Sequence, residues 1–204
     1  MRNGLWSLKT VNIRDYADDK HKTVDDTVFG GGSGMLMKPD IVANSLDKNI
    51  SKGEKIFYLS PKGKKFNQSF ANSLSKQNGI NLICGHFEGV DDRLLSTRNI
   101  EEISIGDYVL SGGETAAFVI LDAVLRLIPG VLGNKDSIKD ETFENSLLEY
   151  PQFTKPKIWE GKSVPEVLFS GDHAKIKSWR LSQSEDITRR QRPDLWEKYL
   201  KDKK

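Results

Sequence analysis

The fold of this chain is constrained most by three short apolar segments. Each is followed by a turn or glycine-containing stretch and then by a helical stretch. The apolar segments cover residues 55–59, 81–84 and 103–110. The helical stretches cover residues 67–77, 91–97 and 114–127. Short apolar runs bounded by turn residues indicate buried strands, so a turn is expected at residues 60–63. Because strands that alternate with helices form parallel sheets, the sequence predicts an α/β fold with a largely parallel sheet.

The remainder of the chain has a different character. Residues 133–140 are polar without a clear period, which is typical of a linker or of a loop ordered by a ligand. Helices are expected at residues 173–181 and 193–200, the second starting with Pro193, a residue suited to the first helical turn. The sequence thus predicts an α/β domain over residues 1–132, a linker over 133–149 and a small, mostly helical domain over 150–204.

A formal net charge of +2 hides an uneven distribution of charge. Residues 151–204 contain 13 Lys and Arg against 8 Asp and Glu, whereas residues 1–150 contain 18 against 21. A basic segment behind a mildly acidic body predicts a polyanionic partner for the C-terminal part. The alternative is a solvated helical surface that is merely rich in lysine.

Several classes of protein are excluded by composition. The longest apolar run, residues 116–121, ends at Asp122 and is too short to span a bilayer. The chain start lacks the apolar core of a secretion signal, and the single cysteine, Cys84, permits neither an internal disulfide nor a multi-cysteine zinc site. We therefore expect a cytoplasmic protein without a structural metal.

Glycine marks the first candidate ligand-binding loop, which reads Gly-Gly-Gly-Ser-Gly at residues 30–34. Glycine leaves backbone amides accessible and tolerates positive φ, which suits the close approach of a phosphate or nucleotide. The segment is neither a Walker loop nor a dinucleotide-binding fingerprint. Polar side chains of His21, Asp25 and Asp26 precede it. A flexible surface loop is the alternative interpretation.

Two further glycine-containing segments follow predicted strands. Residues 84–93 read Cys-Gly-His-Phe-Glu-Gly-Val-Asp-Asp-Arg, and residues 104–114 read Ser-Ile-Gly-Asp-Tyr-Val-Leu-Ser-Gly-Gly-Glu. Open α/β sheets bind ligands at the carboxyl ends of their strands, so these loops and the first one predict a shared pocket. The first segment fits the H-x-E of zinc deaminases, but the required C-x-x-C is absent. The alternatives are an acidic cluster that caps a helix and a tight turn that needs positive φ.

These segments, in order along the chain, resemble bacterial tRNA (guanine-N1)-methyltransferases, which methylate the guanosine at tRNA position 37, beside the anticodon. The resemblance covers almost the whole chain. Besides the three glycine-containing segments, it rests on Tyr-Leu-Ser-Pro at 58–61, Ile-Pro-Gly-Val-Leu-Gly at 128–133, Leu-Glu-Tyr-Pro at 148–151, Leu-Phe-Ser-Gly-Asp-His at 168–173 and Trp-Arg at 179–180.

The resemblance implies a knotted α/β domain (a SPOUT-type trefoil knot), a homodimer with active sites at the subunit interface, and S-adenosylmethionine held in the knot mostly by backbone groups. The tRNA would lie across two subunits, and Asp25, Gly34, Arg189 and Arg190 would contact it. The implied cofactor-binding residues are Tyr58, Leu59, Ser60, Pro61, Gly85, Phe87, Glu88, Gly89, Ser104, Ile105, Gly106, Asp107, Tyr108, Val109, Leu110, Gly112 and Gly113.

The same resemblance implies the catalytic groups. A carboxylate must accept the guanine N1 proton, and a cation must stabilise the charge that then spreads towards O6. The cation implied is Arg126. The base implied is Glu141, where the family usually has aspartate, or Asp140 if the register differs by one residue. The activity of the family is also dependent on Mg²⁺.

Departures from the family leave other interpretations open. Phe87, Ala116 and Ser33 stand where tyrosine, proline and proline are common, and none carries a proton. The family also begins about one strand and one helix before Met1, so we expect the start to be trimmed. A catalytically impaired RNA-binding homologue is one rival; a nucleotide-dependent oxidoreductase is another, disfavoured because the dinucleotide-binding fingerprint is missing.

Three side-chain environments are also open at this stage. Without the resemblance, Arg126 would be interpreted as a cation at the edge of an apolar helix. Trp179 and Trp196 are expected in the core of the small domain, with platforms for base stacking as the alternative. The cluster of Arg189, Arg190 and Arg192 is expected to contact phosphate, with a solvated loop before a helix as the alternative.

Overall fold

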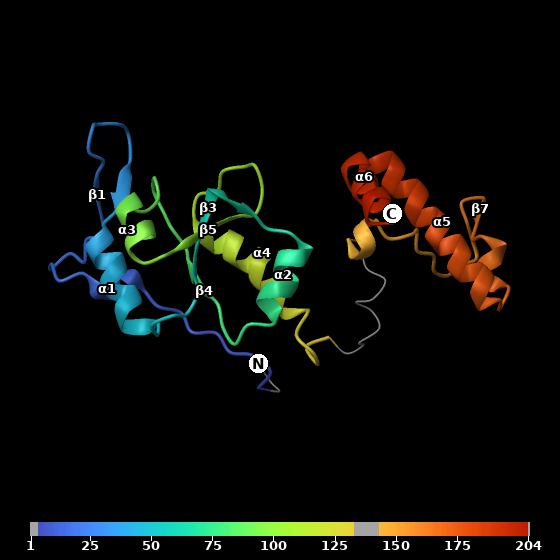
Figure 1. Ribbon diagram of the computed structural model, residues 1–204, viewed down its shortest axis with the longest axis horizontal. Helices are drawn as coiled ribbons and strands as arrows, with labels where there is room; N and C mark the ends of the chain where they lie inside the picture. Colours follow the sequence, from blue (N-terminus) through green and yellow to red (C-terminus); the bar gives the residue numbers. More distant parts are fainter. Residues whose placement is uncertain (1–3, 133–142, 204) are drawn as a thin grey trace. The chain divides into compact units, whose positions relative to one another are not determined.

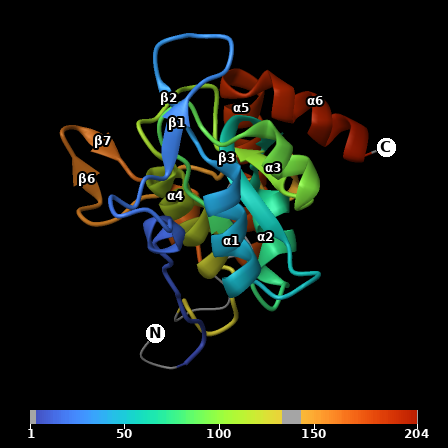
Figure 2. The ribbon, with the colours of Figure 1, turned by 90° about the vertical axis from the view of Figure 1, so that its left-hand side faces the viewer.

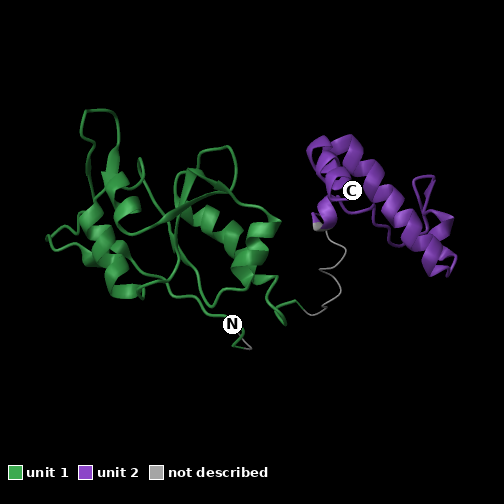
Figure 3. Ribbon diagram, viewed as in Figure 1, with its two compact units in different colours: residues 1–133 green, residues 134–204 purple. Residues whose placement is uncertain are grey.

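The computed structural model describes residues 4–132 and 143–203 and divides the chain into two compact units, residues 1–133 and 134–204 (Figures 1 and 3). The first unit contains a parallel sheet with helices on both faces, and the second is mostly helical. None of the helices within the described ranges has the length and apolar character needed to cross a membrane.

A three-stranded sheet forms the centre of the first unit and confirms the predicted parallel arrangement. Its strands are β3 (Ile56–Lys65), β4 (Asn81–Ile83) and β5 (Glu101–Ser104), in the order β4-β3-β5. Successive side chains of a strand point to opposite faces, so Phe57 packs on one side of the sheet and Tyr58 on the other.

Two pairs of helices cover the two faces of this sheet (Figure 1). Helices α2 (Gln68–Ser75) and α4 (Gly113–Leu125) pack on the face of Phe57, while α1 (Pro39–Asn49) and α3 (Asp92–Thr97) pack on the face of Tyr58. The first core contains Phe57, Leu59, Ala71, Leu74, Ile103, Ala116, Ala117, Ile120 and Val124. The second contains Met37, Val42, Leu46, Tyr58, Ile83, Val90, Leu94 and Ile100.

Side-chain caps determine where two of these helices begin. The Asn67 side chain accepts a hydrogen bond from the N–H of Phe70 at the start of α2, and the Asp91 side chain accepts one from the N–H of Arg93 at the start of α3. Such caps satisfy N–H groups that have no partner within the helix. The acidic cluster after residue 90 therefore caps a helix, which was one of the two interpretations of the sequence.

The sequence misplaced the ends of two strands. The expected turn at residues 60–63 is an irregularity within β3, because both Leu59 and Lys64 lie opposite Ile103. The expected strand over 103–110 ends at Ser104, and the Ser104 hydroxyl exchanges hydrogen bonds with the Gly106 backbone at 3.2 and 3.3 Å. With Gly106 at a φ of 156°, the chain turns away from the sheet and residues 105–112 form a loop.

An antiparallel hairpin and a short helix precede the sheet, and neither was predicted. The hairpin consists of β1 (Asp25–Thr27) and β2 (Met35–Met37), and the 3-10 helix η1 covers Ile13–Tyr16. The glycine-rich segment at residues 30–34 lies in the loop that joins the two strands, and this loop projects from the first unit (Figures 1 and 2).

The second unit is built on two consecutive helices, α5 (His173–Gln191) and α6 (Pro193–Asp202). Both were predicted, although α5 extends ten residues beyond the expected end at 181. Pro193 begins α6 as expected. The smaller elements are the 3-10 helices η3 (Glu144–Ser146) and η4 (Glu166–Phe169) and the two-stranded sheet of β6 (Ile158–Trp159) and β7 (Lys162–Ser163).

Candidate functional site

The loops after β4 and β5 meet beside each other at the carboxyl edge of the parallel sheet. The N–H of Gly113 donates a 2.9 Å hydrogen bond to the carbonyl of Gly85. A Cβ atom at Gly113 would lie 2.6 Å from the Cα of Cys84, so only glycine allows the start of α4 to approach this loop so closely. The structure thus brings together two of the segments that the sequence assigned to one pocket.

The Tyr58 ring packs against the loop after β4. Its side chain is only 8% exposed, and its ring occupies the space that a Cβ atom on Gly85 or Gly89 would need, at 2.7 and 2.8 Å. Burial raises the pKa of the Tyr58 hydroxyl. The two glycines that the sequence assigned to ligand approach therefore also have a structural role, because they leave room for this ring.

A strained turn lies above Tyr58. Phe87 has a φ of 59°, a conformation that non-glycine residues adopt rarely, and the N–H of Gly89 closes the turn on the carbonyl of His86. The Phe87 ring is half exposed. Strained backbone of this kind is concentrated at ligand-binding sites, and here it holds an aromatic ring at the edge of the loop.

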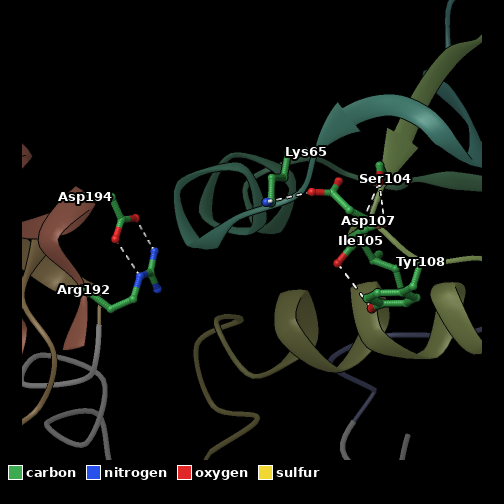
Figure 4. A network of polar contacts seen from close by, with 8 residues as sticks. Lys65, Ser104, Ile105, Asp107, Tyr108, Arg192 and Asp194 are labelled. Carbon is green, nitrogen blue, oxygen red and sulfur yellow. Dashed lines mark hydrogen bonds and ion pairs between the residues drawn. The ribbon is translucent and has the colours of Figure 1, made fainter.

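The loop after β5 folds back on itself. The Tyr108 hydroxyl lies 3.4 Å from the Ile105 carbonyl, to which it donates a hydrogen bond, and the ring fills the space beside Gly106 (Figure 4). Asp107 forms an exposed ion pair with Lys65 of β3 at 3.9 Å. Val109 is 86% exposed, and Tyr108 and Leu110 are also exposed. The loop therefore presents apolar side chains to solvent beside the peptide groups of the glycines.

The β1–β2 hairpin contacts the loop after β4, which joins the first glycine-rich segment to the other two. The N–H of Glu88 donates to the Met35 carbonyl at 2.9 Å, and the N–H of Met37 donates to the Gly89 carbonyl at 2.9 Å. A Cβ atom at Gly34 would lie 2.5 Å from Oε1 of Glu88. Two predicted site residues from separate motifs, Gly34 and Glu88, are therefore in contact.

The remaining predicted residues of the first unit are spread over three strands and the start of α4. Leu59 and Ser60 are buried in β3, and Pro61 is exposed in its irregular part. Ser104 is buried at the end of β5, and Gly112 is the N-cap of α4. Asp25 pairs with Met37 at the base of the hairpin, on the strand that leads to the glycine-rich loop.

His86 and Glu114 form a polar pair beside these loops that was not predicted from the sequence. His86 Nε2 lies 3.4 Å from Oε2 of Glu114, and a Cβ atom at Gly112 would lie 2.9 Å from the same nitrogen. In the sequence, His86 is marked only by the H-x-E pattern of zinc deaminases. Among residues 4–132 and 143–203, no group of three or more His, Cys, Asp or Glu is arranged to hold a metal ion.

Of the predicted catalytic residues, only Arg126 lies within the described part of the chain. It is half-buried and is the C-cap of α4, where its N–H bonds to the carbonyls of Asp122 and Val124. Glu141 and Asp140 lie outside the described residues.

The predicted phosphate-binding arginines of the second unit carry carboxylate partners. Arg189 and Arg190 lie in the last turn of α5, not in a loop, and both pair with Asp186, at 3.1 and 2.7 Å. Arg192 pairs with Asp194 at 2.6 Å (Figure 4). The Arg192 guanidinium holds the pKa of Asp194 below its ordinary value through hydrogen bonds. Exposed pairs of this kind contribute at most about 1 kcal/mol each, so a phosphate can compete for these cations.

Comparison with known proteins finds relatives over almost the full length of the chain. The family model described as "tRNA (Guanine-1)-methyltransferase TrmD" matches residues 1–198. The chain is 74% identical over 201 residues to the tRNA (guanine-N(1)-)-methyltransferase of Pelagibacter ubique. This alignment covers 98% of this chain and 88% of that protein. It is 54% identical over 203 residues to the enzyme of the same name from Bartonella tribocorum, and 52% identical over 204 residues to that from Brucella canis. These alignments cover all of this chain, and 87% and 83% of the respective relatives. The chain belongs to the tRNA (guanine-N1)-methyltransferase family.

Proposed function

We propose that this enzyme transfers a methyl group from S-adenosylmethionine to N1 of the guanosine at tRNA position 37. The observation that carries the proposal is the family match over residues 1–198, together with the contact between the glycine-containing loops in the first unit. The second unit, with its excess of basic residues, would contact the tRNA.

The loops after β4 and β5 fit the cofactor in chemical terms. Adenine needs peptide N–H and carbonyl groups along its edge and apolar contacts on its faces. The exposed side chains of Phe87, Tyr108 and Leu110 lie beside glycine peptide groups that have no side chain to obstruct them. We therefore assign cofactor binding to these loops.

The chemistry requires a base and a cation from this chain. Bound S-adenosylmethionine would supply a methyl group made electrophilic by the adjoining sulfonium. Glu141, or Asp140 if the register differs by one residue, would accept the guanine N1 proton. The Arg126 guanidinium would stabilise the negative charge that develops at O6 as that proton leaves. Mg²⁺ is expected to support the activity, but the described residues hold no cluster suited to it, so no step is assigned to the metal.

The proposal extends to the chain topology, the oligomeric state and the location of the protein. The family fold predicts a trefoil knot in the first unit, a homodimer and a cytoplasmic location. Support for the dimer comes from α4, which has Phe118 69% exposed and Val119 also exposed on the side opposite its buried residues. Exposed apolar side chains grouped on one helix are typical of a surface that another subunit covers.

Substitution of the two candidate bases tests the mechanism. Glu141→Gln removes the proton acceptor and keeps the shape of the side chain, so methyl transfer to unmodified tRNA should fall by about 100-fold or more. Binding of S-adenosylmethionine, measured by calorimetry, should change by less than about twofold. Asp140→Asn is the matched control. If Asp140→Asn abolishes transfer and Glu141→Gln does not, Asp140 is the base.

The same assay separates the enzyme from its rival. Labelled methyl groups from S-adenosylmethionine should appear in tRNA that carries guanosine at position 37, and tRNA with adenosine there should remain unlabelled. A protein that binds both ligands and transfers no label would instead be the catalytically impaired RNA-binding homologue.

A further inference from the structure

The C-terminal unit contains a cavity of about 490 Å³ that none of the predicted site residues line. This volume falls within the range of ~300 to 1,000 Å³ that is usual for small-molecule sites. The walls come from the segment before β6, from η4 and from one side of α5. The lining residues are Tyr150, Pro151, Gln152, Phe153, Thr154, Lys155, Lys157, Val164, Leu168, Phe169, Ile176, Trp179 and Arg180.

Aromatic rings form much of the cavity wall. Phe153 and Trp179 lie with their ring centroids 6.3 Å apart, and Tyr150 and Phe169 complete the set. The sequence placed Trp179 in the core, but its side chain is half-buried and faces this cavity. Phe153 and Phe169 are about half exposed, so their faces are available to a flat ligand. Such rings bind nucleic-acid bases by stacking with little preference for sequence.

The charged residues of the wall are all cations. Lys155, Lys157 and Arg180 line the cavity, and none of the described lining residues is an Asp or Glu. The Lys157 ammonium lies 4.6 Å from the centroid of the Phe169 ring, and the Arg180 guanidinium lies 4.8 Å from that of Tyr150. A pocket that combines aromatic rings with cations suits a ligand with a flat ring and a negative charge.

Arg180 also has a donor without an acceptor. Its Nε is buried, and it makes no hydrogen bond within the described part of the chain. A buried donor without a partner costs free energy, which the Arg180 side chain would recover if it moved to meet an acceptor on an entering ligand. Arginine is the usual partner of base-edge acceptors and phosphate oxygens, both of which a nucleotide carries.

We propose that this cavity binds one unstacked nucleotide of the tRNA, with the base against the aromatic rings and the phosphate near Lys155 and Lys157. The inference rests on the proposed function, in which tRNA is the substrate, and it assigns a second point of contact away from the methylated guanosine. Protein recognition of RNA commonly uses bases in loops that are splayed out and stacked on aromatic side chains.

Three variants of the full-length chain test the cation side of this site. Lys157→Gln and Arg180→Gln remove lining cations, and Lys177→Gln is the matched control because Lys177 is an exposed residue of α5 outside the cavity. The measurement is the Kd for unmodified tRNA at several salt concentrations. Each lining variant should weaken binding by about tenfold, and Lys157→Gln should also reduce the slope of log K against log salt by roughly 0.7 to 0.9, the change for one phosphate that the protein no longer neutralises. The control should stay within about twofold of the wild type.

A fourth variant tests the stacking side. Phe153→Leu should also weaken tRNA binding by about tenfold but leave the salt slope unchanged, because stacking involves no counterion release. Since Phe153 is half exposed, the variant should retain its fold, which circular dichroism would show.

The outcomes distinguish this inference from the function on which it rests. If the wild type binds tRNA and all three lining variants match Lys177→Gln, the cavity does not bind RNA and the inference is wrong. If the wild type binds S-adenosylmethionine but no tRNA, the proposed function fails as well. If the lining variants alter the oligomeric state in sedimentation at unchanged tRNA affinity, a second copy of the chain occupies the cavity, which also overturns the inference.

Discussion

At the scale of single residues, the candidate cofactor site depends on glycines that make room for a tyrosine. The first prediction is that Gly85→Ala destabilises the protein and weakens S-adenosylmethionine binding. The new Cβ atom would lie 2.7 Å from Cε2 and 2.9 Å from the hydroxyl of Tyr58, so the ring must move. Overpacking of this kind costs about 1–3 kcal/mol in the free energy of unfolding. We expect the Kd for the cofactor, measured by calorimetry, to rise at least tenfold.

Gly79→Ala provides the control for this prediction. A Cβ atom at Gly79 meets no atom within 4 Å, and the residue does not adopt positive φ. The Tm and the cofactor Kd of this variant should therefore equal those of the wild type or show slight stabilisation. Equal effects of the two substitutions would show that the close approach of Gly85 to the Tyr58 ring affects neither stability nor cofactor binding.

The second prediction concerns Cys84, the single cysteine, which lies beneath the start of α4. Burial, with a smaller contribution from the negative charge of Glu114, raises the pKa of the thiol to about 11. Because only the thiolate reacts, alkylation by iodoacetamide at pH 8 should be about 100-fold slower in the folded protein than in the urea-unfolded chain. Similar rates in the two states would show that the thiol is accessible and ionised as in a free peptide.

At the scale of elements, the pairing of α5 with α6 gives the third prediction. The Tyr199 hydroxyl donates a 2.7 Å hydrogen bond to Oε1 of Glu185, and the Lys203 ammonium lies 3.3 Å from the same oxygen. These contacts, the tyrosine first, lower the pKa of Glu185 below its ordinary value. The stabilisation is thus complete above the unfolded pKa of about 4.5 and is lost as the pH falls through the lower folded pKa.

Tyr199→Phe should accordingly reduce the free energy of unfolding of the second unit by about 1 kcal/mol at pH 7 and by less below pH 4. Urea unfolding followed by tryptophan fluorescence suits the measurement, because Trp159, Trp179 and Trp196 all lie in this unit. Glu185→Gln is the control, since it retains an acceptor but cannot titrate. A difference between wild type and Tyr199→Phe that stays constant from pH 3 to pH 7 would contradict the assigned contact.

The same scale shows what the sequence could predict. Side chains that cap a helix stand at the start of α2 and α3, where Asn67 and Asp91 lie, whereas α4 was predicted from its long apolar stretch. The ends of β3 and β5 could not be found from local signals. They depend on a register shift opposite Ile103 and on hydrogen bonds between Ser104 and Gly106, which form only when the sheet assembles.

Prediction of the candidate site was uneven for a similar reason. Glycine-marked strand ends indicated the loops, and the contact of Gly34 with Glu88 agrees with a shared site. The unpredicted β1–β2 hairpin creates that contact, and His86 meets Glu114 because the loop after β4 and the start of α4 lie at the same sheet edge. Motifs therefore indicated which segments lie together, whereas chain pairing decided which side chains face each other.

At the scale of the whole molecule, the uneven distribution of charge predicts that salt affects the binding of tRNA and of S-adenosylmethionine differently. The proposed tRNA contacts are cations of the second unit, chiefly Lys155, Lys157, Arg189 and Arg190. Because Lys155 and Lys157 would share one phosphate, these cations make about three phosphate contacts, which would weaken tRNA binding by roughly 20- to 40-fold between 50 and 200 mM salt. The proposed binding of S-adenosylmethionine uses peptide groups and apolar contacts, so its Kd should change far less over this range.

A pair of variants makes the last prediction specific to the arginines of α5. Arg189 and Arg190 share Asp186, which must release them before they can bind phosphate. Asp186→Asn should therefore tighten tRNA binding by more than Asp18→Asn, which changes the net charge equally at an exposed position in the first unit. We expect about a threefold difference in Kd at 100 mM salt, because each exposed ion pair released contributes a few tenths of a kcal/mol. Equal effects of the two substitutions would mean that only net charge matters and that Arg189 and Arg190 do not contact the tRNA.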